Sequence, residues 1–218
     1  KKKWKKDIIK GTGDTYLKQN ESLIFMNEDD LKKQMTKAEK ASQEFYRIHS
    51  YKGFSKKILG DKIITKQINE KGKIVSKAKK SSLGSYEREF KGERIYSLDN
   101  SLLIVDEAQN FVNDSDNSEA LQNIIENSIN LKILLLSATP MNNKADEIIS
   151  LLNYLRPKDD PIERSKMFNS KTNYEMDLRP DGLEYFKKMS SGYISHLRGA
   201  DPLTFALKNE YGIKPKGL

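Results

Sequence analysis

The sequence predicts an α/β fold in which helices flank a parallel sheet, and three patterns indicate it. Two short apolar runs, Leu102–Val105 and Ile133–Leu136, are bounded by polar residues, as in parallel strands buried on both faces. Between these two runs, Ser118–Ile129 carries its apolar residues on one helical stripe. After the second run, Ala145–Leu155 shows the same pattern and ends before Pro157. This order of strand, helix, strand and helix predicts a right-handed βαβ crossover in one parallel sheet.

Composition limits the classes of protein to which the chain can belong. Its 218 residues can bury one large domain with an appendage. No apolar run approaches the length of a membrane span, so no membrane partner is expected. Cysteine is absent, which excludes disulfides and thiolate metal sites and fits a reducing compartment. The net charge of +8 is equally compatible with a polyanionic partner and with a solvated, lysine-rich surface.

The part before residue 60 is expected to contain alternating helices and short strands. Turn-forming and capping residues separate the apolar patterns there. The predicted elements are a helix at Trp4–Leu17 with stop signals at Gly11 and Gly13, a strand at Leu23–Met26, a helix at Leu31–Phe45, a strand at Tyr46–Tyr51 and a helix at Gly53–Leu59.

Two further regions define the expected domain organisation. Residues 61–94 are rich in lysine, serine and glycine and poor in apolar residues, which indicates a basic and mobile surface insertion or an excursion without a role. Residues 158–176 are polar and are expected to form a connector. The predicted division is a sheet-containing lobe over residues 1–157 and a connector with a mainly helical extension over residues 158–218, with short elements at Leu183–Met189 and Tyr193–Arg198.

Polar side chains follow both predicted sheet strands, where ligands of open parallel sheets bind. Asp106 and Glu107 come directly after the first strand, and Ser137 and Thr139 follow the second. A carboxylate at such a position suits Mg²⁺, and a second carboxylate beside it can orient or deprotonate an attacking water. Hydroxyl groups on the neighbouring strand can hydrogen-bond the carboxylates or the surroundings of a γ-phosphate. Together the two patterns predict a nucleotide-hydrolysing site.

These residues resemble motifs of superfamily 2 helicases and translocases. Asp106-Glu107-Ala108-Gln109 is similar to motif II, a Walker B sequence of the DEAQ type, and Ser137-Ala138-Thr139-Pro140 is similar to motif III. The continuation from Met141 to Leu155 resembles the Swi/Snf-like branch. The segment Ser191–Gly199 resembles helicase-like proteins of large nucleocytoplasmic DNA viruses, a group related to the small subunit of the poxvirus early transcription factor.

The resemblance implies a partial, RecA-like first motor lobe with ATP and Mg²⁺ as cofactors. It implies that Asp106 holds Mg²⁺, that Glu107 activates water and that Gln109 contacts the nucleotide or a second lobe. It assigns Ser137, Ala138 and Thr139 to the coupling of hydrolysis to movement. Nucleic-acid contacts are expected at His49, Ser50 and Tyr51, near the position of motif Ib, and at Arg198.

The implied function is that of a viral motor on double-stranded DNA, acting in transcription with a second transcription-factor subunit or RNA polymerase. Its expected location is the virion or a replication compartment in the cytoplasm or nucleus of the host cell. Two alternatives stay open: a non-catalytic scaffold in a transcription complex, and another superfamily 2 motor such as a restriction-enzyme translocase subunit.

No phosphate-gripping P-loop pattern occurs in the sequence. The resemblance places that motif before Lys1 and a second lobe, with its arginine finger, after Leu218. Because Lys1 is not a translation start, we expect the chain to be part of a longer protein and to be inactive as an ATPase by itself.

Overall fold

The computed structural model of the chain describes residues 2–17, 28–112, 115–141, 143–170 and 176–196. The chain forms two compact units, Lys1–Thr139 and Pro140–Leu218. The sequence-based boundary at residue 157 therefore differs from the division between these units and stays a prediction for the intact lobe. No helix within the described ranges is both long and apolar enough to cross a membrane.

The first unit opens with helices that the sequence largely predicts. These are α1 (Lys2–Thr12), the 3-10 helix η1 (Gly13–Tyr16), α2 (Glu28–Ser42) and α3 (Tyr51–Leu59). The helix α1 packs against α2, and Ile9 and Ala38 are fully buried there. The predicted strand at Leu23–Met26 lies outside the described residues.

The strand predicted at Tyr46–Tyr51 is absent from the structure. Residues 46–50 have no regular structure, and Tyr51 is already the first residue of α3. The side chain of Ser50 accepts a hydrogen bond from the backbone N–H of Gly53, so it caps the helix. Sequence alternation over six residues was therefore outweighed by a local helix-starting signal.

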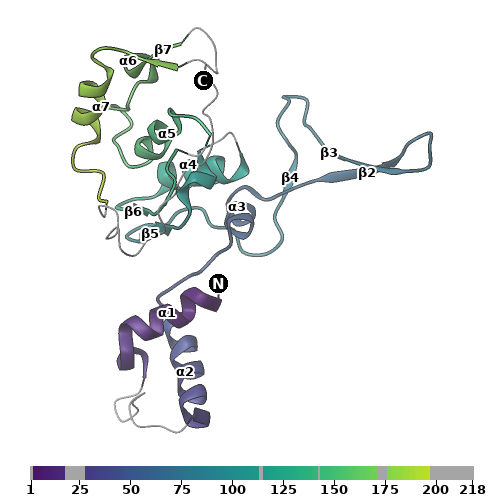
Figure 1. Cartoon of the computed structure of the whole chain (residues 1–218). Helices are drawn as coiled ribbons and strands as arrows, with labels where there is room; N and C mark the ends of the chain where they lie inside the picture. The colour runs from purple at the N-terminus through teal and green to yellow at the C-terminus, as the bar shows by residue number, and fades with distance from the viewer. Residues whose placement is uncertain (1, 18–27, 113–114, 142, 171–175, 197–218) are drawn as a thin grey trace, which may run out of the picture. The chain divides into compact units, whose positions relative to one another are not determined.

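The predicted parallel sheet is present and is short. The strand β5 (Leu102–Val105) pairs in parallel with β6 (Lys132–Leu135), and α4 (Asp116–Asn127) makes the crossover between them (Figure 1). Ser115 and Ser118 form a capping box at the start of α4. The buried face of α4, with Ala120 and Ile124, packs against α3, which completes the main core of this unit.

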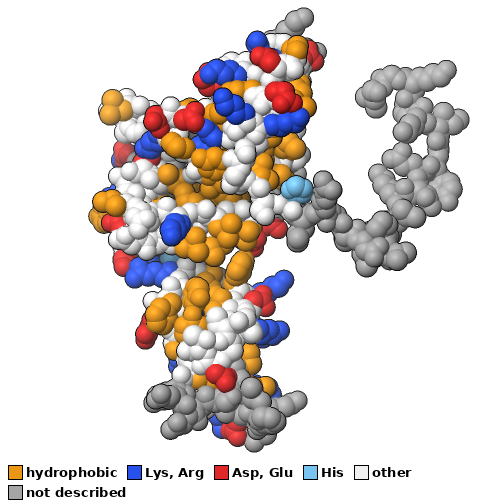
Figure 2. Space-filling model, turned by 90° about the vertical axis from the view of Figure 1, so that its left-hand side faces the viewer, with side chains coloured by type: hydrophobic (Ala, Val, Ile, Leu, Met, Phe, Trp, Pro, Cys, Tyr) orange, Lys and Arg blue, Asp and Glu red, His pale blue; other side chains and the backbone are white. Residues whose placement is uncertain are grey.

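The expectation that both sheet strands are buried on both faces is wrong for the described chain. Leu102, Ile104 and Leu134 are 59%, 44% and 45% exposed, because successive side chains point to opposite faces and α4 covers only one of them. Ile129, expected on the buried stripe, is 74% exposed because α4 ends at Asn127. Figure 2 shows hydrophobic side chains, coloured orange, at the surface on the side of the molecule that it draws.

The basic insertion folds as a two-stranded ribbon. Its strands are β2 (Ile64–Ile68) and β3 (Ile74–Ala78), which pair antiparallel, and its base is closed by β1 (Asp61–Lys62) and β4 (Arg88–Glu89). In Figure 1 the ribbon projects from α3 and the sheet of the same unit.

The second unit has its own small core, and part of it comes from the predicted connector. Its elements are α5 (Glu147–Asn153), α6 (Arg164–Met167), β7 (Phe168–Ser170), β8 (Met176–Leu178) and α7 (Gly182–Ser190). Ile162, Met167 and Phe168 are buried against Ile149 and Leu152. The described residues of the segment 158–176 are therefore not simply a polar connector, because three apolar side chains among them contribute to a small core.

The segment Tyr193–Arg198 is only partly described. Residues 193–196 contain no helix or strand, so the element predicted there is not found over these residues. Residues 197 and 198 lie outside the described part of the chain.

A glycine at the start of α7 permits a close backbone approach. A Cβ added at Gly182 would lie 2.4 Å from the backbone oxygen of Met167, whereas one added at Gly11 in α1 would meet nothing within 4 Å. We expect Gly182→Ala to destabilise the second unit by about 1–3 kcal/mol. Hydrogen–deuterium exchange of peptides from α6 and α7 measures this loss.

The matched control is Gly11→Ala, which we expect to stabilise α1 by roughly 0.5–1 kcal/mol because alanine favours the helix. Unchanged exchange in α6 and α7 of the Gly182→Ala variant would contradict the close packing of Gly182 on Met167.

Candidate active site

The parallel register brings the ends of the two sheet strands together. Val105 lies opposite Leu135, and the backbone N–H of Leu136 donates to the carbonyl of Val105 at 2.8 Å. Three residues after Val105, the N–H of Ala108 donates to the carbonyl of the same Leu136 at 2.9 Å. These bonds fix the segment after β5 beside the segment after β6, so the two predicted motifs share one edge of the sheet.

A sharp backbone turn at Glu107 lies two residues after the end of β5. Glu107 adopts a left-handed conformation with φ 51° and ψ 53°, and it starts the 3-10 helix η2 (Ala108–Phe111). This conformation is uncommon for residues other than glycine and is typically held by its surroundings. Here the carboxylate of Asp106 accepts from the N–H of Glu107 at 3.2 Å, and the side chain of Asn110 donates to its carbonyl at 2.9 Å.

Gln109 joins the two motifs through both ends of its amide. Its Nε2 donates to Oε2 of Glu107 at 2.6 Å, and its Oε1 accepts from the hydroxyl of Ser137 at 2.6 Å. The same hydroxyl oxygen accepts from the backbone N–H of Thr139 at 3.1 Å. A continuous chain of hydrogen bonds therefore runs from the Glu107 carboxylate to the motif III backbone. All of Ser137, Ala138 and Thr139 are exposed, so solvent or a ligand can reach them.

Tyr51 contacts this site directly, which the sequence did not indicate. Its hydroxyl donates to the backbone carbonyl of Asp106 at 2.7 Å, and its ring packs edge-to-face on Phe111 with centroids 5.4 Å apart. Partial burial and the nearby negative charges of Asp106 and Glu107 raise the pKa of Tyr51, and a hydrogen bond with Asn110 offsets part of the effect. Tyr51 therefore links the start of α3 to the end of β5.

Ser50 and His49, which are also predicted to contact nucleic acid, have their described contacts with residues of α3. Ser50 caps α3, and the ring of His49 packs at a tilt on Phe54. His49 also lines a surface pocket with three cationic side chains and one acidic one, Lys5, Arg47, Lys57 and Glu93. Arg198 lies outside the described residues. The assignment of these residues to nucleic acid stays a prediction.

The donor set suits a hard cation that keeps most of its water. Asp106 and Glu107 present exposed carboxylates, and no cluster of three or more histidine or acidic side chains capable of holding a metal occurs among the described residues. Mg²⁺ is usually bound through one or two carboxylates together with substrate phosphates and waters. The side chains at this edge therefore fit Mg²⁺ brought with a nucleotide better than a metal held by protein ligands alone.

The SNF2-related domain family matches residues 4–198 of this chain, which include both sheet strands and every residue of the hydrogen-bonded chain described above. The chain belongs to this family. Membership confirms the resemblance to superfamily 2 helicases, and the α/β architecture with a short parallel sheet agrees with a partial lobe of the RecA-like type.

Relatives of this SNF2-related chain occur in large DNA viruses. It is 46% identical over 213 residues to a protein of Acanthamoeba polyphaga mimivirus named "Putative ATP-dependent RNA helicase", covering 97% of this chain and 18% of that protein. A "Putative helicase" of Invertebrate iridescent virus 3 is 35% identical over 113 residues, which cover 49% of this chain and 10% of that protein. The chain thus spans less than a fifth of either relative. No solved structure gives a significant match.

The raised pKa of Tyr51 predicts a change of stability at alkaline pH. An ordinary phenol has a pKa of 10.0, so the unfolded chain ionises first and stability falls as pH rises through that value. We expect Tyr51→Phe to lose less stability than the unaltered protein over this range. Denaturant unfolding followed at pH 8 to about 11 measures the difference.

The control is Tyr96→Phe, which removes an exposed phenol. Equal alkaline losses of stability in the unaltered protein and both variants would contradict the hydrogen-bonded, partly buried environment of Tyr51.

Proposed function

We propose that this SNF2-related chain forms half of the ATP-hydrolysing site of a viral motor that moves on double-stranded DNA. The observation that carries the proposal is the hydrogen-bonded chain from Glu107 through Gln109 and Ser137 to Thr139, which connects an acidic strand end to a hydroxyl-bearing neighbour. A site that hydrolyses nucleotide and transmits its state needs such a connection. A scaffold has no need of an acidic pair joined to a neighbouring strand.

The proposed roles come from the resemblance to superfamily 2 motors, and the contacts of the described residues support them. Asp106 would hold Mg²⁺, which neutralises charge on the phosphates when bound. The Glu107 carboxylate, held by the amide of Gln109 at 2.6 Å, would orient water and accept its proton. A change in the phosphate environment near Ser137 would shift Gln109 and Thr139 together, because one hydroxyl bonds both.

The nature of the nucleic acid is part of the proposal. Double-stranded DNA is proposed from the Swi/Snf-like residues after motif III, whereas two mimivirus relatives carry the name of RNA helicases. Viral transcription, with a second transcription-factor subunit or RNA polymerase as partner, is proposed from the same resemblance. Measurements with duplex DNA and with duplex RNA decide between the two nucleic acids.

Glu107→Gln in the complete protein tests the catalytic assignment. We expect stimulated ATP hydrolysis to fall by at least about 10²-fold, because the general base is removed, while ATP binding is retained. Steady-state hydrolysis with and without nucleic acid, together with nucleotide binding, measures both effects.

Glu126→Gln on α4 makes the same chemical change at an exposed position and should leave turnover unchanged. Full turnover in the Glu107→Gln protein would show that Glu107 is not the general base. Loss of nucleotide binding in this variant would show that its role is structural.

Gln109→Leu tests the connection between the two motifs. The variant keeps the approximate size of the side chain but removes the hydrogen bonds to Glu107 and Ser137. We expect kcat to fall by about tenfold or more through misorientation of the carboxylate, with little change in the affinity for nucleotide.

The matched control is Gln122→Leu at an exposed position of α4. If Gln109→Leu and Gln122→Leu hydrolyse ATP equally fast, the hydrogen-bonded chain has no part in turnover.

A further inference from the structure

The ribbon Ile64–Ala78 concentrates positive charge that the rest of the fold does not neutralise. It and the two residues after it contain six lysines and one glutamate, within a chain whose net charge is +8. Lys79 pairs with Glu87 at 2.8 Å, and Lys80 lies over the ring of Tyr86. The other four are exposed, and within the described part of the chain no acidic side chain pairs with them; they are Lys66, Lys71, Lys73 and Lys77.

These four lysines surround the ribbon instead of lying on one side of it. Lys66 is opposite Ser76 in the register, whereas Lys77 is opposite Thr65, so their side chains project from opposite faces. Lys71 and Lys73 lie at the turn, which Gly72 closes with a φ of 71°. A flat acidic surface could engage only one face of such a ribbon. A groove with phosphates along both walls engages both faces and the tip.

The dimensions of the ribbon suit one kind of groove. Two paired strands lie about 4.8 Å apart, and five residues of strand extend about 17 Å. The major groove of B-form DNA is about 12 Å wide and admits a two-stranded ribbon, whereas the corresponding groove of duplex RNA is too narrow for side chains to enter.

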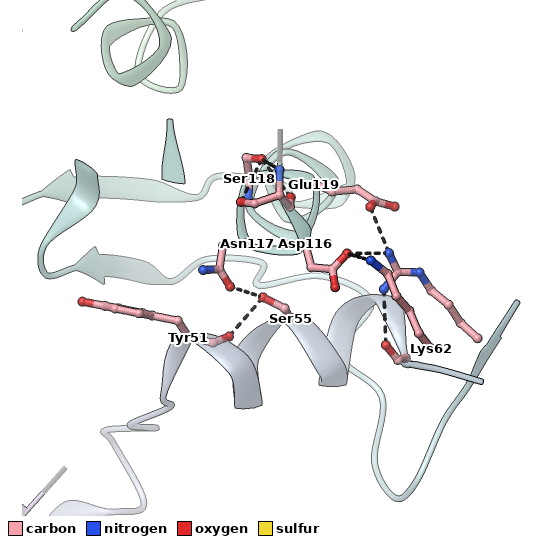
Figure 3. Close-up of polar contacts among 10 residues, drawn as sticks. Tyr51, Ser55, Lys62, Asp116, Asn117, Ser118 and Glu119 are labelled. Atoms are coloured by element: carbon pink, nitrogen blue, oxygen red, sulfur yellow. Dashed lines mark hydrogen bonds and ion pairs between the residues drawn. The ribbon is translucent and has the colours of Figure 1, made fainter. Parts of the chain in front are cut away.

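The base of the ribbon is attached firmly to the helix behind the sheet. The guanidinium of Arg88 contacts Asp116 at 2.8 Å and Glu119 at 3.1 Å, both in the first turn of α4. The ammonium of Lys62 contacts Asp116 at 3.0 Å, and Figure 3 labels these two residues together with Glu119. Arg88 also donates to the carbonyl of Gly60 at 3.4 Å, and its side chain is only 15% exposed. The base of the ribbon is therefore attached to α4, the crossover helix between β5 and β6.

We infer that the ribbon Ile64–Ala78 enters the major groove of duplex DNA and that Lys66, Lys71, Lys73 and Lys77 bind the phosphates of both strands. This inference rests on the proposed function and adds to it a DNA-binding surface outside the motif-bearing edge of the sheet. Its interactions are with the DNA backbone, so they position the motor without reading sequence. A grip that is independent of sequence is what a motor moving along DNA requires.

The ribbon also has an apolar side, which makes a protein partner the alternative to DNA at this surface. Ile64, Ile68 and Ile74 share the face of Lys66 and are 59%, 75% and 67% exposed. A protein partner could cover that face. Unpaired charge on both faces and at the tip favours DNA, because a protein on the isoleucine face would leave Lys77 in solvent.

The test is a complete protein in which Lys66, Lys71, Lys73 and Lys77 are all changed to Gln. Affinity for duplex DNA is measured by fluorescence anisotropy over a series of salt concentrations. We expect Kd near 0.1 M salt to rise at least about tenfold. The slope of log Kd against log salt concentration should weaken by about 0.9 for each phosphate that the variant no longer neutralises. ATP hydrolysis without nucleic acid should be unchanged.

A matched variant changes Lys32, Lys33, Lys37 and Lys40 of α2 to Gln and removes the same charge from another surface. It should keep most of the DNA affinity and salt dependence. If both variants bind DNA equally weakly, the loss of affinity comes from the lower net charge alone. That result would overturn the inference.

Three other outcomes are decisive. If the unaltered protein does not bind duplex DNA, the proposed function fails before the ribbon is at issue. If it binds, and the ribbon variant keeps both affinity and salt dependence, only the ribbon assignment is wrong. If Ile68→Thr with Ile74→Thr abolishes binding of a protein partner while the lysine variant binds DNA normally, the ribbon is a protein-docking surface instead.

Discussion

The parallel pairing of β5 with β6 is the constraint on which the candidate site depends. Only parallel strands end at the same edge of a sheet, and the register that places Val105 opposite Leu135 sets which side chains meet there. The backbone bonds of Leu136 and Ala108 extend this pairing beyond the strands. The amide of Gln109 can therefore reach both an acidic residue beside it in the sequence and a serine on the neighbouring segment.

The helix α4 supports both surfaces of the first unit to which we assign a function by proposal. Its buried side, with Ala120 and Ile124, packs toward Phe54 and Ile58 of α3 and keeps the strands in place. Its first turn holds the base of the ribbon through Asp116 and Glu119. Burial alone would raise the pKa of Asp116, but the hydrogen bonds and charges of Arg88 and Lys62 outweigh it and lower that pKa. The carboxylate of Asp116 thus stays charged at a lower pH than an ordinary aspartate does.

Local sequence patterns predicted the helices and strands whose apolar residues follow one another closely at the spacing of a strand or a helix. The strand β5 has the bounds expected from its apolar run, β6 is displaced by one residue, and α7 extends one residue beyond each end of the prediction. Predictions failed where a weak pattern competed with a stronger local or tertiary effect. Alternation before Tyr51 yielded to the Ser50 cap, and the polar stretch after Pro157 hid three apolar residues that only packing reveals.

The sequence by itself determined the family, the acidic and hydroxyl-bearing strand ends and the crossover that makes them neighbours, because short-range periodicity and motif chemistry are written in adjacent residues. The tertiary structure decided three further features: the left-handed turn at Glu107, the contact of Tyr51 with Asp106 and the orientation of the lysines around the ribbon. Each depends on how separate segments of the chain are held together. Their juxtaposition follows from strand register and helix packing, which a reading of neighbouring residues does not contain.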